Sequence, residues 1–221
     1  GINLHGKKNW LGSFAVPWAV VNDLSVLASL DERDWRSGFS EAVKVGLVRD
    51  NSLFDRIERD ATAIAGRDMA AAEPIIRASA EHHLRHITEG GDPFELNEAR
   101  PLDFGHWAAH RLEHLSGYRV KHGEAVAIGV ALDTLYSAGA GFLAERESER
   151  VLTCLRDLGF ALWDESLRPA DRLLDGLEEF REHLGGRLTI SMLRGVGRAF
   201  DVHEIDRGLM GRALERLAAN A

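Results

Sequence analysis

The chain has 221 residues, of which 45% are hydrophobic and 28% are charged, as in one sizeable globular domain with or without a small appendage. Its net charge of -8 disfavours a surface for nucleic acid or for an anionic membrane. Its one cysteine, Cys154, cannot form an internal disulfide, and no apolar stretch approaches the ~18 residues that span a bilayer. With no signal-peptide pattern at the start, these features predict a cytoplasmic protein without nucleic-acid or membrane partners.

The sequence predicts helices along most of its length. The first 22 residues are glycine-rich and irregular, and they end in an apolar run, Val16–Val21, that predicts a short strand. Asp23 is expected to cap a short helix, and Asp50 to cap a longer one. Gly185-Gly186 leads into 187–193, the second predicted strand. The other predicted helices are 34–48, 68–87, 101–115, 124–136, 145–158, 170–184 and 203–218.

Three short segments carry side chains that suit a metal site. Glu41 and Lys44 lie three residues apart on one face of the helix predicted at 34–48. His106 and His110 lie four apart and share a helix face, and His122 opens the next helix. One carboxylate with two or three imidazoles is a typical ligand set for a catalytic zinc ion, which keeps one position open.

Each segment alone has a simpler explanation. A buried Glu41 needs a partner, and Lys44 by itself could be that partner. Two histidines four apart are common in helices by chance, and His122 alone is an ordinary N-terminal histidine. Spacing does not decide which histidines bind, but the three segments together favour a metal site.

At this point the segments resemble a known family, the dehydroquinate synthase-like sugar phosphate cyclases. The resemblance covers nearly the whole chain and is carried, in the family's order, by residues 6–14, 40–46, 103–113 and 122–129. It implies a mainly α fold, the helical C-terminal domain of a two-domain enzyme, with a short strand or hairpin. The NAD-binding α/β domain of the family is expected to be missing before Gly1. Residues 1–22 would then be an interdomain segment and 23–221 the metal- and substrate-binding domain.

The resemblance also implies roles for single residues. Glu41, His106 and His122 match the zinc ligands of the family, with cobalt as a possible metal. His110 then matches a histidine that is associated in the family with the substrate phosphate and with proton transfer. Lys44 matches the lysine beside the metal. Glu113 and Glu124 are expected to cap helices or to bond a metal histidine. The expected NAD contacts are Lys8, Val26, Leu27, Ala28 and Ser29.

The implied reaction is that of an NAD- and zinc-dependent carbon–oxygen lyase. A ring hydroxyl of a heptulose phosphate is transiently oxidised, phosphate leaves by elimination, and an intramolecular aldol step closes a carbocycle. Partners would be the sugar phosphate, the missing NAD-binding domain and a second copy in a homodimer. The chain alone is expected to be inactive.

Departures from the family pattern bear on the substrate. Asp103 stands where the family has asparagine, Ala99 where it has arginine, and His83 near a lysine of the dehydroquinate synthases. Fewer cations and an added carboxylate favour a hydroxyl-rich substrate, sedoheptulose 7-phosphate, and so cyclitol biosynthesis. In the alternative, Arg100 and Arg181 replace the cations, leaving a true 3-dehydroquinate synthase of the shikimate pathway. The expected substrate contacts are Asn9, His83, Arg100, Asp103 and Arg181.

Two further classes remain open. Metal-dependent polyol dehydrogenases share a two-domain plan, but the segment His122–Gly129 and the Glu41–Lys44 pair favour the cyclases. A catalytically incomplete module retained for assembly would also fit a missing NAD-binding domain.

Overall fold

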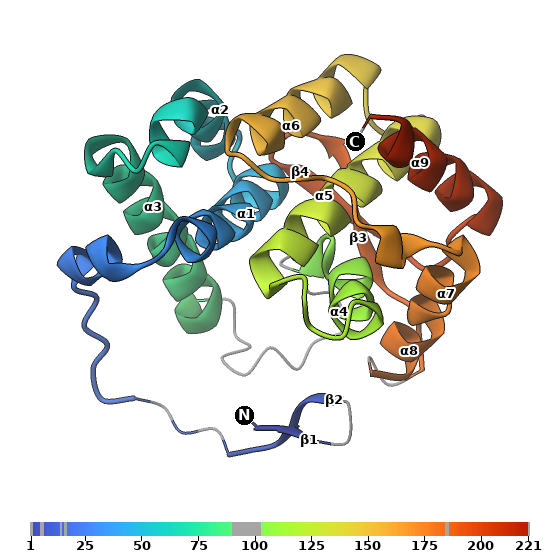
Figure 1. The fold of residues 1–221 in the computed structure, drawn as a ribbon, viewed down its shortest axis with the longest axis horizontal. Coiled ribbons are helices and arrows are strands. Elements are labelled where there is room, and N and C mark those ends of the chain that lie inside the picture. The colour runs from blue at the N-terminus through green and yellow to red at the C-terminus, as the bar shows by residue number, and fades with distance from the viewer. Residues whose placement is uncertain are drawn as a thin grey trace. The chain divides into compact units, whose positions relative to one another are not determined.

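The computed structural model describes residues 2–4, 7–13, 15, 17–89, 103–183 and 186–220. They fall into two compact units, residues 1–31 and 32–221. The second unit is mainly helical with one two-stranded sheet, which confirms the predicted fold class (Figure 1). Among the described helices, none combines the length and apolar character needed to cross a membrane.

The first unit contains a small antiparallel sheet. Strand β1 (Ile2–Leu4) pairs with β2 (Lys7–Leu11). The strand predicted at Val16–Val21 is wrong, because its described residues, 17–21, form no strand. Pro17 has no backbone N–H for a sheet ladder, and Trp18 beside it is fully exposed.

A short 3-10 helix, η1 (Leu24–Ser29), ends this unit. The Asp23 carboxylate accepts a hydrogen bond from the Ser25 N–H at 2.9 Å, so the predicted cap is confirmed. The sequence predicts buried leucines in this segment, but none of its residues is buried within the described chain.

The second unit, drawn from light blue to red in Figure 1, contains the remaining elements. In chain order these are α1 (Glu32–Arg49), α2 (Asn51–Ala65), α3 (Met69–Glu89), α4 (His106–Leu115), α5 (His122–Gly139), α6 (Glu145–Asp157), η3 (Glu165–Leu167), α7 (Ala170–Leu174), α8 (Gly176–His183), β3 (Ile190–Gly195), β4 (Arg198–Val202) and α9 (Arg207–Ala219).

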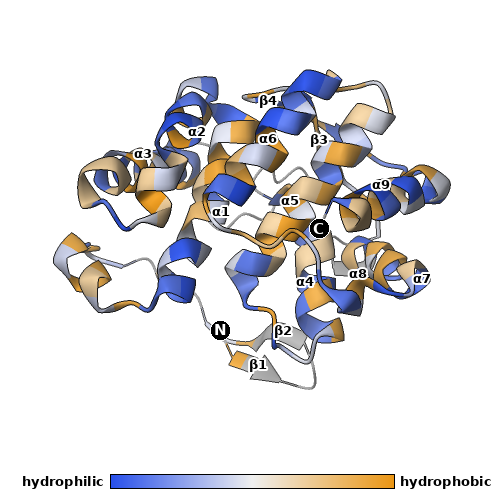
Figure 2. Cartoon of the chain, turned by 45° about the horizontal axis from the view of Figure 1, so that its top comes forward, coloured by the Kyte–Doolittle hydropathy of each residue, from blue (hydrophilic) through white to orange (hydrophobic). Residues whose placement is uncertain are grey.

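Helix α5 is the centre of this unit. It contacts α1, α4, α6, α9 and β3, and it is buried along most of its length. Its sequence is apolar on all sides, as a helix enclosed by others requires, and Figure 2 draws it mostly in apolar colours. The predicted central helix is therefore confirmed.

The corner between α1 and α2 follows the predicted cap. The Asp50 carboxylate accepts hydrogen bonds from the N–H groups of Ser52 and Leu53, at 2.9 and 3.1 Å. Its second oxygen lies 2.7 Å from Nε2 of His82 on α3. One side chain thus caps α2 and ties a third helix to the corner.

Three predicted helices have clearly different bounds, and the one predicted at 203–218 begins only at Arg207 as α9. Helix α4 begins at His106, not at residue 101, because Gly105 has a φ of 79°, which a right-handed helix cannot contain. The helix predicted at 170–184 breaks at Asp175 into α7 and α8. A Cβ on Gly176 would lie 2.9 Å from Cβ of Arg111, so this glycine permits close packing on α4.

The predicted strand at 187–193 is confirmed as β3, shifted toward its C-terminal end. It forms an antiparallel hairpin with β4, with Ile190 opposite Val202 and Met192 opposite Phe200. Gly197, with a φ of 75°, supplies the turn between the two strands.

Candidate metal centre

The carboxylate of Glu41 lies between two histidines that come from other helices. Its Oε1 is 3.4 Å from Nε2 of His106 and 3.4 Å from Nε2 of His122. Its Oε2 lies 2.5 Å from Nζ of Lys44. The structure therefore brings the three predicted segments together where α1 meets the first turns of α4 and α5.

The outer nitrogens of both imidazoles have acceptors within the protein. Nδ1 of His106 lies 3.3 Å from the Phe104 carbonyl oxygen, and Nδ1 of His122 lies 2.9 Å from Oε2 of Glu113. Each Nδ1 can therefore carry the proton, which leaves the lone pair of each Nε2 facing Glu41. Two lone pairs and a carboxylate repel one another unless a cation lies between them or a ring is protonated.

The spacing suits a tetrahedral metal ion. Zinc bonds to nitrogen and oxygen of about 2.0–2.2 Å place neighbouring tetrahedral ligands roughly 3.3–3.5 Å apart. The observed separations from Glu41 Oε1 to the two Nε2 atoms are both 3.4 Å. The donor types suit such an ion, and both separations from Glu41 match a tetrahedral edge.

His110 completes a second possible grouping. His106, His110 and His122 each offer a nitrogen, and these three atoms all lie within 4.8 Å of one another. The ring of His110 stacks on that of His122 with centroids 5.7 Å apart, and His110 is exposed whereas His106 is buried. We favour the set with Glu41 because its separations match a tetrahedral edge, and His110 then lies on the solvent side.

Electrostatics keep Glu41 ionised. Burial alone would raise the pKa of this carboxyl. In the form in which the rings donate from Nε2, hydrogen bonds from His106 and His122, with the charge of Lys44, hold its pKa well below the ordinary range. Lys44 is only 6% exposed, so its ammonium group pairs with this carboxylate inside the protein rather than with water.

Close backbone contact brings His122 to Glu41. A Cβ on Gly123 would lie 2.2 Å from the carbonyl oxygen of Ser37 on α1, so only glycine permits this approach. Ion pairs between Arg33 and Glu124, and between Lys121 and Asp34, join the same two helix ends. Glu124 also accepts a hydrogen bond from the Lys121 N–H at 2.9 Å, the expected cap.

The other predicted contacts lie on other elements or outside the described residues. Asp103 lies in the turn before α4, and His83 is exposed on α3. Arg181 on α8 donates to Oε2 of Glu178 at 2.8 Å and to the Gly186 carbonyl at 3.2 Å. Arg100 lies outside the described residues. Lys8 and Asn9 lie in β2, and Val26, Leu27, Ala28 and Ser29 lie in η1, the short helix that Asp23 caps. All of these remain predictions.

Asp133 was not among the residues predicted from the sequence. This fully buried carboxylate of α5 accepts hydrogen bonds from the Gly105 N–H and from Nε1 of Trp107, both at 2.9 Å. A lone charged residue in the apolar stretch 125–136 was the available signal.

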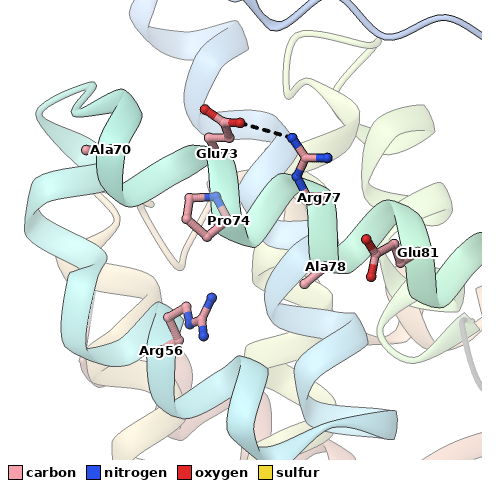
Figure 3. A pocket seen from close by; sticks show the side chains of 7 residues that line it. All are labelled: Arg56, Ala70, Glu73, Pro74, Arg77, Ala78 and Glu81. Carbon is pink, nitrogen blue, oxygen red and sulfur yellow. Dashed lines mark hydrogen bonds and ion pairs between the residues drawn. The ribbon is translucent and has the colours of Figure 1, made fainter.

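A separate cavity of about 370 Å3 is lined by residues of α2 and α3 (Figure 3). Arg56 comes from α2, whereas Glu73, Arg77 and Glu81 come from α3, and Glu73 pairs with Arg77 at 3.1 Å. None of the predicted site residues lines it, and its two arginines balance its two glutamates. The cavity therefore offers no reason to move the site away from the histidines.

Comparisons with known proteins show the family of the chain. Residues 38–178 match the family described as 3-dehydroquinate synthase C-terminal. A 3-dehydroquinate synthase of Ruegeria sp. (strain TM1040) is 38% identical over 210 residues, covering 90% of this chain and 55% of the relative. One of Ruegeria pomeroyi is 36% identical over 230 residues, covering 100% of this chain and 60% of the relative. The chain thus spans little more than half the length of these relatives.

Solved structures give the same family. The 2-epi-5-epi-valiolone synthase ValA of Streptomyces hygroscopicus subsp. jinggangensis 5008, with NAD+ and Zn2+ bound, matches with a TM-score of 0.92 at 30% identity, covering 100% of this chain and 61% of ValA. A 2-deoxy-scyllo-inosose synthase matches with a TM-score of 0.78 at 19% identity, covering 97% of this chain and 61% of that structure, which supports the fold alone. The chain belongs to the dehydroquinate synthase-like family of sugar phosphate cyclases, whose C-terminal part it matches.

Proposed function

We propose that Glu41, His106 and His122 bind a divalent metal, zinc or alternatively cobalt, in an NAD-dependent sugar phosphate cyclase. The observation that carries the proposal is the position of Glu41 Oε1, 3.4 Å from each of two inward-facing Nε2 atoms. The bound Zn2+ and NAD+ of ValA support the same cofactors here.

The chain's own residues have distinct tasks in this proposal. The metal would supply Lewis-acid polarisation of a substrate hydroxyl, and NAD would supply transient oxidation of its carbon. Glu113 keeps the proton of His122 on Nδ1, so that Nε2 faces inward. Lys44 holds Glu41 in place and presents an ammonium group to the same space. His110 is exposed and adjacent, so it can exchange a proton between the substrate phosphate and solvent.

For the substrate we propose sedoheptulose 7-phosphate, with a cyclitol as product. Two observations support this choice. Asp103, in the turn before α4, adds a carboxylate that suits hydroxyl groups better than a substrate carboxylate. The match to ValA, a valiolone synthase, extends over the whole chain.

A second candidate is the 3-dehydroquinate synthase reaction of the shikimate pathway. It is favoured by the curated relatives, which carry that name at 38% and 36% identity. Under this candidate Arg100 and Arg181 would bind the substrate carboxylate.

Further parts of the proposal concern the whole protein. Because the chain spans 55–60% of its relatives, we propose that an N-terminal domain completes the NAD site with Lys8 and the segment Val26–Ser29, and that Asn9 contacts the substrate. We also propose a cytoplasmic homodimer, in keeping with a single buried cysteine, Cys154.

The decisive experiment measures phosphate release by the protein at its full natural length, with NAD and zinc. Sedoheptulose 7-phosphate and the carboxylated substrate of dehydroquinate synthase are compared, with His122→Ala as the metal-deficient control. Release from the first substrate alone supports our proposal, and release from the second alone selects the second candidate. Release from neither by metal-loaded protein contradicts the cyclase assignment.

A further inference from the structure

Asp133 is a carboxylate in the apolar interior. It lies in the middle of α5 with no exposed surface. Burying a carboxylate is costly unless both of its oxygens find donors. Here both do, because Oδ2 accepts from the Gly105 N–H and Oδ1 accepts from Nε1 of Trp107, each at 2.9 Å.

These two donors lie on either side of His106. Gly105 is the residue before α4 and has no side chain with which to cap the helix. The first N–H groups of a helix lack partners within it, and an acidic group there is favourable. Asp133 therefore accepts from the N-cap N–H of α4 from a neighbouring helix, as the third residue of a helix does in a capping box.

Close packing also restricts the backbone and the side chain next to His106. Gly105 has a φ of 79°, and a Cβ on it would lie 2.6 Å from the backbone nitrogen of Val130 on α5. Trp107 is 1% exposed, so its ring cannot turn without disturbing the core. The backbone before His106 and the side chain after it are thus both fixed against α5.

We propose that Asp133 is a positioning residue for the metal centre, which sets the rotation of the first turn of α4 and so the direction of His106 Nε2. The inference rests on the proposed function, because it takes His106 as a metal ligand. A purely structural Asp133 would stabilise the fold without changing the geometry around a bound ion.

The test uses Co2+, whose visible absorption reports the number and arrangement of its ligands. Burial raises the pKa of Asp133 to about 7, against the hydrogen bonds from Trp107 and Gly105, so titrations are made at pH 8. Asp133→Asn keeps the size of the side chain but replaces one carboxylate oxygen with an NH2 group. That group would face either the Gly105 N–H or the Trp107 Nε1–H, both of which are donors. Trp107→Phe removes the Nε1 donor together with part of the buried ring volume, a loss of packing that the stability control below takes into account.

Two variants serve as controls. Thr134→Val changes the next residue of α5, which is equally buried and whose hydroxyl has no hydrogen-bond partner among the described residues. Ile57→Val lowers stability from a core position of α2 and separates loss of stability from loss of metal.

We expect Asp133→Asn to weaken Co2+ affinity about 10- to 100-fold and to alter the absorption spectrum, as loss of a group that orients a ligand does. Trp107→Phe should do the same more weakly, and the two controls should bind like the wild type. Unchanged affinity and spectrum in a folded Asp133→Asn would overturn the inference. If that variant does not fold, the same result for Trp107→Phe would overturn it. Failure of the wild-type protein to bind Co2+ would instead contradict the proposed metal site itself.

Discussion

Oε2 of Glu113 lies 2.9 Å from Nδ1 of His122, the nitrogen opposite to the one that faces Glu41. Glu113 is 8% exposed, so the carboxylate side of this hydrogen bond is sheltered from water. A sheltered carboxylate behind an imidazole fixes its tautomer and increases its basicity as a ligand.

Removing this carboxylate should weaken metal binding without abolishing it. For Glu113→Ala we expect a loss of zinc affinity of about 10- to 100-fold, measured by competition with a chromophoric chelator. Glu113→Gln keeps an oxygen that can accept from Nδ1, so it should recover most of the affinity. Equal losses in both variants would show that the charge matters and the hydrogen bond does not.

Removing single histidines should separate the two possible groupings at the metal centre. His122→Ala should abolish stoichiometric zinc, because it deletes one of three ligands. His110→Ala should keep zinc and lose turnover. Metal content after dialysis is the measurement, and loss of zinc from His110→Ala would favour the grouping of three histidines instead.

Gly123→Ala should disturb the fold and the metal centre together. Its methyl group would lie 2.2 Å from the Ser37 carbonyl oxygen, so α5 must move away from α1 and carry His122 from Glu41. We expect the free energy of unfolding, measured by urea denaturation, to fall by about 1–3 kcal/mol and zinc affinity to drop.

Gly38→Ala is the matched control for that variant. Gly38 adjoins Ser37 in α1, and nothing lies within 4 Å of an added Cβ. Replacing an unobstructed helical glycine by alanine should raise the free energy of unfolding by up to about 1 kcal/mol. Wild-type stability and zinc affinity in Gly123→Ala would contradict the close approach.

The Asp50 cap should make stability depend on acid. The hydroxyl of Ser52 is the main reason that the pKa of Asp50 falls from 3.8 to about 2, with burial opposing it and His82 and Leu53 assisting. Because the folded state binds this proton less readily than the unfolded state, the contribution of Asp50 is present above about pH 4 and is lost as the pH falls toward 2.

Urea unfolding at pH 7 and pH 3 tests this. Asp50→Ala should lose about 0.5–2 kcal/mol at pH 7, because the cap of α2 is gone. Asp50→Asn keeps the cap without the charge, so its difference from the wild type should narrow at pH 3. A difference that stays constant with pH would show that the carboxylate charge contributes nothing.

Much of the fold could be predicted because its signals are local. The spacing of Trp35, Phe39, Val43 and Leu47 predicts α1, and the aspartate caps at 23 and 50 are where they were expected. The start of α4 could not be predicted, because it depends on the left-handed conformation of Gly105 and on its packing against Val130. Such contacts between distant segments leave no periodic pattern.

At the candidate centre, too, some residues could be predicted from the sequence and others could not. Motifs in the sequence were enough to name the residues that converge there, because carboxylate, imidazole and amine side chains in these motifs indicate metal binding. These residues are Glu41, Lys44, His106, His110 and His122. Asp133 could not be predicted in this way, because its role comes from the packing of α5 against α4 rather than from its neighbours in sequence. The expected substrate contacts remain predictions.

The ionised groups around Glu41 have a consequence for the order of events at the site. Two carboxylates, Glu41 and Glu113, and one ammonium group, Lys44, leave this neighbourhood with one net negative charge. A dication reverses that sign. Under the proposed function, an anionic sugar phosphate would be repelled before the ion binds and attracted afterwards, so metal binding would precede and promote substrate binding.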